Sequence, residues 1–328
     1  MRFATKHLDK RTAKGRFSTN THFGVAQTEN RLRSPASQRV ACVLFFLLLS
    51  ASPLLAVGRL QVVVVPVANM YSSPNENADV VSQAIYGSNV TLIASRGEWS
   101  KIQTPGDHYP GWTRSRYLRI VQSGNGYATT GRIVQVESLF ANVYRETDVT
   151  RHKPIVTIPF ESNLEVIADG QGSDNGWLKV HLPDKQAAWI QAGDVADPKP
   201  LSIPESIELA KRFLGLPYLW GGRSSFGFDC SGFTQMLVRV RGIDMPRDAD
   251  KQAAWKGVIA VDRKDLQPGD LLFFGSAADK ITHTAMYIGD GQIVQATTNG
   301  HPVVQISRLD DQPWSRLLVA CRRVRGTK

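Results

Sequence analysis

The last third of the chain contains a cysteine, a histidine and a glutamine that could act as a nucleophile, a base and a group that orients the base. The segment L-P-Y-L-W-G-G-R-S-S-F-G-F-D-C-S-G covers residues 216–232 and is followed by apolar residues at helical spacing, Phe233, Met236, Leu237 and Val240. Cys230 is therefore predicted at the N-terminus of a helix, with Asp229 as its cap. Free N–H groups and the helix dipole at that end favour a thiolate and could stabilise an oxyanion.

The candidate base is His283, because five of the seven histidines precede residue 198 and the other one left, His301, lies among loop residues. His283 begins a β run that is joined by Gly289-Asp290-Gly291 to a second run, which predicts a hairpin. The turn brings His283 nearly opposite Gln295, and the strand register decides whether the two share a face. If they do, Gln295 can hydrogen-bond one imidazole nitrogen while the other faces Cys230.

Other chemistry receives little support from the sequence. No third ligand accompanies Cys230 and His283 at metal-binding spacing, so no metal site is predicted. Cys321 is interpreted as a buried structural thiol, and an oxidised Cys230–Cys321 bridge, which would silence the site, is the alternative. No glycine motif for nucleotide binding occurs.

The elements that position these residues can also be predicted. Residues 198–204 indicate a linker, and an amphipathic helix that includes Ile207 and Leu214 is expected to end before Gly215. The segment L-Q-P-G-D-L-L-F-F-G at residues 266–275 predicts a turn that leads into a buried strand.

Two related β-rich segments precede the linker. The first contains Met70-Tyr71, then W-S-K-I from Trp99, then Gly111-Trp112; the second contains Val143-Tyr144, then W-L-K-V from Trp177, then Ala188-Trp189. Each unit is about 60 residues long, a size at which a small barrel can just sustain a core. Most of the four tryptophans are predicted to be core aromatics.

These motifs together resemble a known family. The string D-C-S-G after P-Y-x-W-G-G, followed by P-R, L-x-P-G-D-L-x-F-F and H-x-A-x-Y-x-G, resembles the NlpC-type (NlpC/P60) papain-like cysteine peptidases of the cell wall. The upstream W-x-K and G-W patterns resemble bacterial SH3-like domains. The combination resembles the γ-D-glutamyl-L-diamino acid endopeptidases. The expected architecture is multi-domain: two small all-β SH3-like barrels followed by an α+β papain-like peptidase domain.

The expected boundaries are a basic leader with a signal or anchor segment at 1–58, SH3-like domains at 59–125 and 126–197, and the peptidase domain at 198–328. The resemblance implies that Cys230 is the nucleophile, His283 the base and Gln295 the third residue, at a position where His is commoner. It also implies that Asp229 and Ser231 recognise the free amino group of an N-terminal L-Ala, that Tyr218 lines the pocket, and that Tyr109 narrows the cleft. A small hydroxyl residue usually follows P-R in the family; here Asp248 does, so that position has no implied role.

The expected activity is hydrolysis of the γ-D-glutamyl-L-diamino acid bond, with meso-diaminopimelate as the diamino acid, in peptidoglycan stem peptides. No cofactor is expected, and the sequence does not predict an oligomeric state. Two alternatives remain open. One is a non-catalytic wall-binding protein; the other is an N-acetylmuramoyl-L-alanine amidase or an acyltransferase that uses the same Cys-His dyad.

The charge distribution argues against nucleic acid as a partner. The net charge is +10, but residues 1–40 hold nine Lys/Arg against two acidic residues, which gives +7 and leaves only +3 for the other 288 residues. Residues 40–57 carry no charge, which indicates a secretory signal, or alternatively a retained membrane anchor. We therefore expect an exported protein of the periplasm or cell envelope, held at the inner membrane only if the leader is not cleaved.

Overall fold

The structure is a computed structural model that describes residues 58–121 and 125–326. The predicted signal or anchor segment lies outside these residues. Within the part that is described, no helix is both long and apolar enough to cross a membrane.

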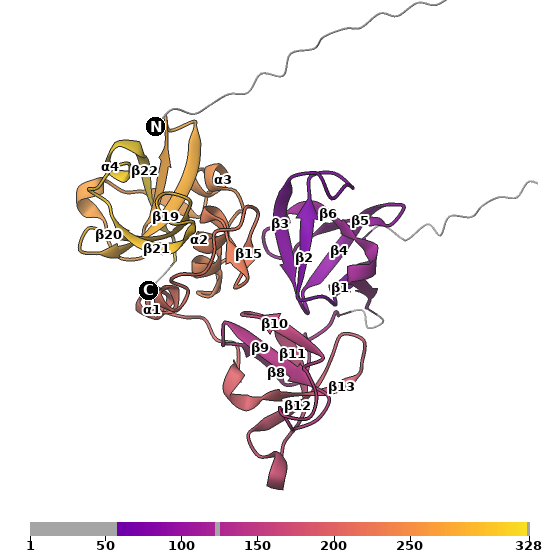
Figure 1. Ribbon diagram of the computed structural model, residues 1–328. Helices are drawn as coiled ribbons and strands as arrows, with labels where there is room; N and C mark the ends of the chain where they lie inside the picture. Colours follow the sequence, from indigo (N-terminus) through magenta and orange to yellow (C-terminus); the bar gives the residue numbers. More distant parts are fainter. Residues whose placement is uncertain (1–57, 122–124, 327–328) are drawn as a thin grey trace, which may run out of the picture. The chain divides into compact units, whose positions relative to one another are not determined.

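The first two sheets have the same topology, as expected for a repeated domain (Figure 1). The first consists of β1 (Leu60–Val63), β2 (Val67–Tyr71), β3 (Val80–Ile85), β4 (Asn89–Arg96), β5 (Trp99–Gln103), β6 (Pro110–Arg114) and β7 (Leu118–Ile120). The second consists of β8 (Ile133–Val136), β9 (Phe140–Tyr144), β10 (Val156–Pro159), β11 (Asn163–Asp169), β12 (Trp177–His181), β13 (Ala187–Gln191) and β14 (Val195–Ala196). Their strand orders, β3-β2-β6-β5-β4-β1-β7 and β10-β9-β13-β12-β11-β8-β14, correspond strand by strand.

The interpretation of the tryptophans as core aromatics was wrong for most of them. Only Trp99 is buried, whereas Trp112, Trp177 and Trp189 are half-buried. Side chains alternate along a strand, and in β6 the flanking Gly111 and Thr113 point inward, so the tryptophan between them must point outward. Aliphatic side chains fill the two barrels instead, including Val63, Val90 and Ile102 in the first and Val143, Leu164 and Ile190 in the second.

The third domain is an α+β unit whose six-stranded antiparallel sheet has the order β17-β22-β18-β19-β20-β21. These strands are β17 (Val258–Ala260), β18 (Leu271–Gly275), β19 (Ile281–Gly289), β20 (Gln292–Thr297), β21 (Val303–Arg308) and β22 (Leu318–Val324). The helices are α1 (Ile203–Arg212), α2 (Cys230–Arg239), α3 (Ala249–Ala253) and α4 (Trp314–Leu317), and a small hairpin pairs β15 (Arg223–Ser224) with β16 (Gly227–Phe228).

Helix α1 begins one turn earlier than its apolar spacing predicted. Ser202 accepts a hydrogen bond from the Glu205 backbone, and the Glu205 side chain accepts one from the Ser202 backbone, which forms a capping box. Pro204 lies in the first turn, where the missing N–H costs nothing. Part of the predicted linker is therefore helical.

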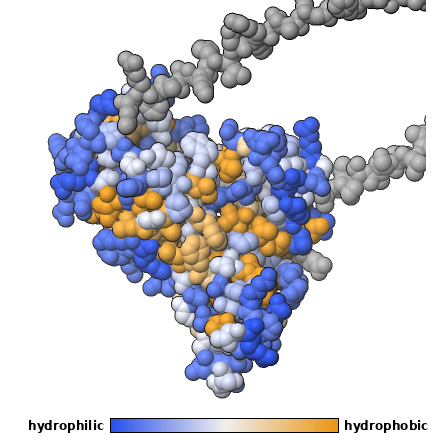
Figure 2. All heavy atoms as spheres, viewed as in Figure 1, coloured by the Kyte–Doolittle hydropathy of each residue, from blue (hydrophilic) through white to orange (hydrophobic). Residues whose placement is uncertain are grey.

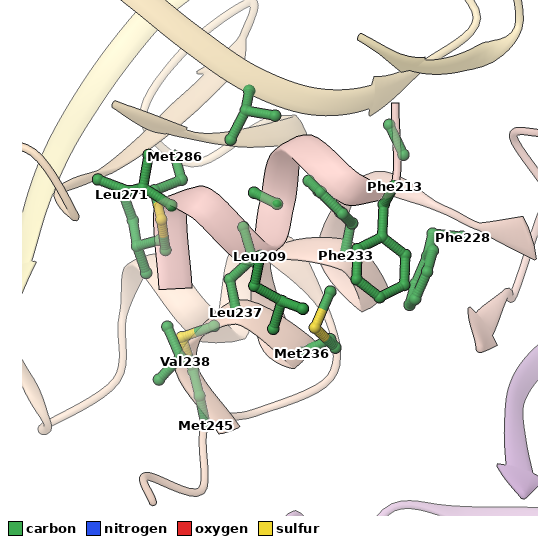
Figure 3. Packing of buried hydrophobic residues seen from close by; sticks show 14 of the residues in the cluster. Leu209, Phe213, Phe228, Phe233, Met236, Leu237, Val238, Met245, Leu271 and Met286 are labelled. Atoms are coloured by element: carbon green, nitrogen blue, oxygen red, sulfur yellow. The ribbon is translucent and has the colours of Figure 1, made fainter. Parts of the chain in front are cut away.

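The core of the third domain forms where α1 and α2 pack against the sheet. Phe213, Phe228 and Phe233 meet edge to face with ring centroids 5.4–6.3 Å apart, beside Met236 and Leu237 (Figure 3). The strand predicted at residues 271–275 is buried along its whole length. This packing gives α2 a rigid base, so the residue at its N-terminus is held in a fixed position.

Some large apolar side chains are exposed, and Figure 2 shows such areas among hydrophilic ones on the face in view. Trp220 is the most exposed of those described, at 69%, and Phe140 of the second barrel packs against Phe226 of the third domain with centroids 4.8 Å apart.

Candidate functional site

Cys230 is the first residue of α2, as predicted, and Asp229 is its N-cap. The Asp229 carboxylate accepts a hydrogen bond from the Gly232 N–H at 2.7 Å. Gly232 is required by close packing, because a Cβ there would lie 2.2 Å from the Gly222 carbonyl oxygen. The loop of residues 216–229 is thus held tightly against the helix end that carries the thiol.

His283 and Gln295 share a face of the β19–β20 hairpin. The paired strands align Met286 with Val294 and Tyr287 with Ile293, which answers the question of register that the sequence left open. The His283 Nε2 and Gln295 Oε1 atoms are 2.6 Å apart, and Gln295 is fully buried.

A further hydrogen bond fixes the orientation of the Gln295 amide. Its Nε2 donates to the Ser307 Oγ on β21 at 3.0 Å, so its Oε1 faces the imidazole. Because an amide oxygen can only accept, the proton must lie on Nε2 of His283 in the neutral ring. Nδ1 then carries the lone pair, which is the form a general base needs.

Two aromatic rings flank the imidazole. Trp314 of α4 stacks on His283 with ring centroids 5.0 Å apart and planes 27° apart, and Phe274 of β18 lies at 5.6 Å. Neither Trp314 nor Ser307 was identified from the sequence, because they lie 31 and 24 residues from His283 and no local motif connects them.

Burial dominates the ionisation of the candidate dyad. It raises the pKa of the Cys230 thiol to about 11, with Asp229 adding to the rise, while Thr284 and Ser231 backbone groups and Arg247 oppose it. Burial also lowers the pKa of His283 to about 4, although Gln295 and Asp229 favour its charged form. Desolvation thus favours the neutral form of both groups, and for the thiol it opposes the helix terminus, which was expected to favour a thiolate.

The Asp229 carboxylate is already engaged by a buried arginine. Arg247 donates to Asp229 Oδ1 and Oδ2 at 2.9 and 2.6 Å, and its side chain is 1% exposed. The same guanidinium donates to the Ser231 Oγ at 2.8 Å and to the Ser82 Oγ of the first barrel at 3.3 Å. Asp229 and Ser231 thus form one network with Arg247, and this arginine had been given no role from the sequence.

A pocket of about 510 Å³ opens beside Cys230, lined by both the third domain and the first barrel. Tyr218 and Tyr109 both line it, together with Asp229 and Ser231, so the structure places all four predicted substrate-binding residues in the same pocket as Cys230. Trp220 also lies on its rim.

Three carboxylates in the pocket were missed by the sequence analysis. Asp79 comes from the turn before β3, Asp248 is hydrogen-bonded to Tyr109, and Asp250 lies in α3. Burial raises the pKa of Asp248, and Arg247 opposes this rise. Burial also raises the pKa of Tyr109 to about 12. The departure from the family pattern after P-R therefore places an acidic group in the pocket.

One glycine allows the barrel to approach the loop. Gly221 has φ +72°, and a Cβ there would lie 2.6 Å from the Val80 carbonyl oxygen of the first barrel. Any larger residue would push β3 away from the pocket.

The remaining candidates lie as follows. Cys321 of β22 is a buried free thiol that packs with Leu272 and Phe274, and Cys230 is also a free thiol. His301 is exposed. Residues 58–121 and 125–326 contain no group of three or more His, Cys, Asp or Glu side chains arranged to hold a metal ion.

Comparisons with known proteins find similarity in both parts of the chain. Residues 215–323 match the model of the NlpC/P60 family, and residues 70–118 match the bacterial dipeptidyl-peptidase SH3 domain. Gamma-D-glutamyl-L-lysine dipeptidyl-peptidase of Bacillus cereus is 34% identical over 66% of this chain and 66% of its own length. The enzyme of the same name from Bacillus subtilis is 31% identical over 74% of this chain and 81% of its own length. The crystal structure of an NlpC/P60 family protein from Bacillus cereus superposes with a TM-score of 0.70 and 26% identity, covering 81% of this chain and 99% of that one.

Proposed function

Because this chain belongs to the NlpC/P60 family, with bacterial SH3 domains ahead of the peptidase domain, we propose that it is a cysteine peptidase that hydrolyses peptidoglycan stem peptides. The bond cleaved is the one between the γ-carboxyl of D-Glu and the diamino acid. The observation that carries this proposal is the Cys230 thiol at the start of α2 combined with a His283 whose tautomer is fixed by Gln295.

The reaction begins with both members of the dyad neutral. Nδ1 of His283 takes the thiol proton as Sγ attacks the γ-carbonyl carbon, and N–H groups at the start of α2 stabilise the oxyanion. The carbon–nitrogen bond then breaks, and the imidazolium gives its proton to the departing amine. In the second half His283 takes a proton from water as the water oxygen attacks the thioester carbon. The carbon–sulfur bond breaks, and the imidazolium returns its proton to the departing thiolate.

The acidic pocket supports a preference for a free N-terminal L-Ala. Asp229 is paired with Arg247 and Asp250 with Lys251, so Asp79 and Asp248 are the carboxylates left to receive an ammonium, beside Tyr109 and Ser231. Asp229 then acts mainly by keeping Arg247 and the helix end in place.

The test uses L-Ala-γ-D-Glu-meso-diaminopimelate and the matching L-lysine peptide, each with a free or an acetylated N-terminus. We expect mass spectrometry to detect L-Ala-D-Glu from the free-amine peptides only. Cleavage of acetylated peptides at the same rate would contradict the amine preference alone. An unchanged peptide, with the protein retained on sacculi, would indicate a wall-binding protein, and release of the peptide from glycan would indicate an amidase.

The matched variant for this test is Cys230→Ala. It is expected to abolish turnover while leaving the circular dichroism spectrum and the melting temperature near those of the unmodified protein. Cleavage by this variant at the original rate would rule out the thiol as nucleophile.

We further propose that the basic leader exports the protein to the periplasm or cell envelope. Cell fractionation should then recover it outside the cytoplasm. Recovery in the cytoplasmic fraction would contradict export.

A further inference from the structure

The β5–β6 hairpin of the first barrel carries Tyr109 into the pocket beside Cys230. The turn between the two strands has the sequence T-P-G-D-H-Y at residues 104–109, with Asp107 two residues before Tyr109. Tyr109 forms a hydrogen bond with Asp248 in the pocket. Asp107 is not one of the residues that line this pocket, so its role has to be inferred from the contacts that it makes.

One carboxylate oxygen of Asp107 closes the turn. Its Oδ1 accepts hydrogen bonds from the Thr104 hydroxyl at 2.5 Å and from the Tyr109 N–H at 3.3 Å. The Thr104 N–H donates to the Tyr109 carbonyl oxygen at 3.1 Å. His108 has φ +52°, in the left-handed region that a non-glycine residue adopts only at a cost. These contacts hold the backbone of Tyr109 in place.

The other oxygen of Asp107 connects the turn to the helix that carries the nucleophile. Gln235 of α2 donates from Nε2 to Asp107 Oδ2 at 3.0 Å and to the Met245 carbonyl oxygen at 2.8 Å. Gln235 is 2% exposed, and its helix begins at Cys230. Burial alone would raise the pKa of Asp107, but Arg223 and these hydrogen bonds outweigh it and lower that pKa. The side chain is therefore an ionised carboxylate that accepts on both oxygens.

The second barrel contains the same turn at its surface. In the β12–β13 hairpin Asp184 accepts a hydrogen bond from the Gln186 N–H at 3.0 Å, and Lys185 has φ +70°. The Leu182 N–H donates to the Gln186 carbonyl oxygen at 2.9 Å. Asp184 and Gln186 are both exposed. The turn is thus a feature of both barrels, and what Asp107 adds in the first is the contact with α2.

We propose that Asp107 is a positioning residue that fixes Tyr109 relative to Cys230. This inference rests on the proposed function, in which Tyr109 lies beside the carboxylates that receive the substrate ammonium. Moving the turn away from α2 requires breaking a charge-assisted hydrogen bond to a buried amide. Asp107 affects substrate binding rather than bond cleavage, because the reacting atoms belong to Cys230 and His283.

The test is Asp107→Asn, with Asp184→Asn as the matched control in the second barrel. An amide has only one acceptor oxygen, so either orientation of the new side chain leaves its N–H group facing that of Gln235 or that of Tyr109. We expect KM for the free-amine stem peptide to rise about threefold to tenfold with kcat nearly unchanged, and no change in the control. A fall in kcat at unchanged KM, or equal KM in the two variants, would overturn the proposal.

A double-mutant cycle tests whether Asp107 acts through Tyr109. Tyr109→Ala removes the side chain that is positioned, so adding Asp107→Asn to it should raise KM by less than about twofold more. A KM rise in the double variant equal to the product of the two single rises would overturn the proposal. Gln235→Leu breaks the same contact from α2 and should reproduce the KM rise, which keeps the test decisive if Asp107→Asn does not fold. An unchanged KM in Gln235→Leu would also overturn it.

Amide hydrogen exchange distinguishes failure of this proposal from failure of the proposed function, because it needs no substrate. The amides of residues 104–109 should exchange about tenfold faster in Asp107→Asn, which breaks either the turn or its contact with α2, and at an unchanged rate in Asp184→Asn. Unchanged exchange in Asp107→Asn would overturn the positioning role even in an active enzyme. Faster exchange in a protein that cleaves no free-amine peptide would contradict the proposed function, while the positioning of Tyr109 would stand.

Discussion

At the scale of single residues, the unusual feature is a neutral amide as the partner of His283. Gln295 fixes the tautomer through its oxygen, but it adds no negative charge that would favour imidazolium. Burial between Trp314 and Phe274 disfavours the imidazolium and lowers the pKa of His283. The site is therefore suited to holding a neutral base until the substrate arrives.

The acid limb of the pH profile of kcat/KM depends on the pKa of His283. His283 must be neutral to accept the thiol proton, so activity is lost as the pH falls through its pKa, and we expect that limb well below 6.5, toward about 4. Gln295→Glu places a carboxylate at the same position, stabilises imidazolium and should move the limb to higher pH. The control Gln186→Glu lies exposed in the second barrel and should leave the profile unchanged. An acid limb near 6.5 in the unmodified protein would contradict this account.

Ser307 is a positioning residue that acts through Gln295. Ser307→Ala removes the acceptor of the amide N–H, so the amide can turn and present its nitrogen to the imidazole. We expect kcat to fall about threefold to tenfold with KM nearly unchanged, and Ser307→Thr to restore it. Steady-state kinetics on the free-amine peptide measure both constants. A KM increase with unchanged kcat would instead indicate a role in substrate binding.

At the scale of elements, local sequence patterns predicted single helices and hairpins, but contacts between residues far apart in the sequence could not be predicted. The N-cap at Asp229, the helix that follows and the β19–β20 hairpin were predicted from neighbouring residues, and the structure confirms them. Register depends on the whole sheet and could not be fixed from the hairpin alone. The Arg247–Asp229 ion pair could not be predicted either, because it joins residues 18 apart across a loop. The desolvation that raises the pKa of the Cys230 thiol could not be predicted either, because burial is set by the complete fold.

The Arg247–Asp229 ion pair is expected to be the most costly contact to break near the site. Arg247→Met leaves the Asp229 carboxylate buried without its partner and should lower the free energy of unfolding by about 3–5 kcal/mol. The control Lys211→Met removes an exposed pair with Glu208 and should cost less than about 1 kcal/mol. Urea unfolding followed by fluorescence measures both. Adding Asp229→Asn to Arg247→Met should recover part of the loss, and equal costs for the two single variants would refute the expected difference.

At the scale of the whole molecule, the repeat of two barrels was readable from the spacing of short motifs, whereas their contacts with the peptidase domain were not. Gln83 of the first barrel accepts hydrogen bonds from the Arg223 backbone and the Ser224 hydroxyl, 140 and 141 residues away. Phe160 of the second barrel belongs to the core of the peptidase domain. Such pairs leave no periodic pattern in the sequence, so Asp79 could not be assigned to the pocket in advance. The first barrel therefore contributes part of the pocket wall, and the second barrel contributes to the core of the peptidase domain.

The ion pair between Glu161 and Arg239 tests how strongly the second barrel is coupled to α2. Their side chains are 9% and 23% exposed, so the pair is less buried than Arg247–Asp229. Glu161→Gln removes the charge that compensates Arg239 and should lower the free energy of unfolding by about 2 kcal/mol, with faster proteolysis at the linker, residues 198–200. Glu146→Gln in the same barrel is the control, because its partners Arg151 and His152 are 67% and 48% exposed, so a change below about 1 kcal/mol is expected. Calorimetry would show a lower or split transition in Glu161→Gln. If both variants melt like the unmodified protein and resist proteolysis equally, the ion pair does not couple the two domains, and the shared core around Phe160 must account for their docking.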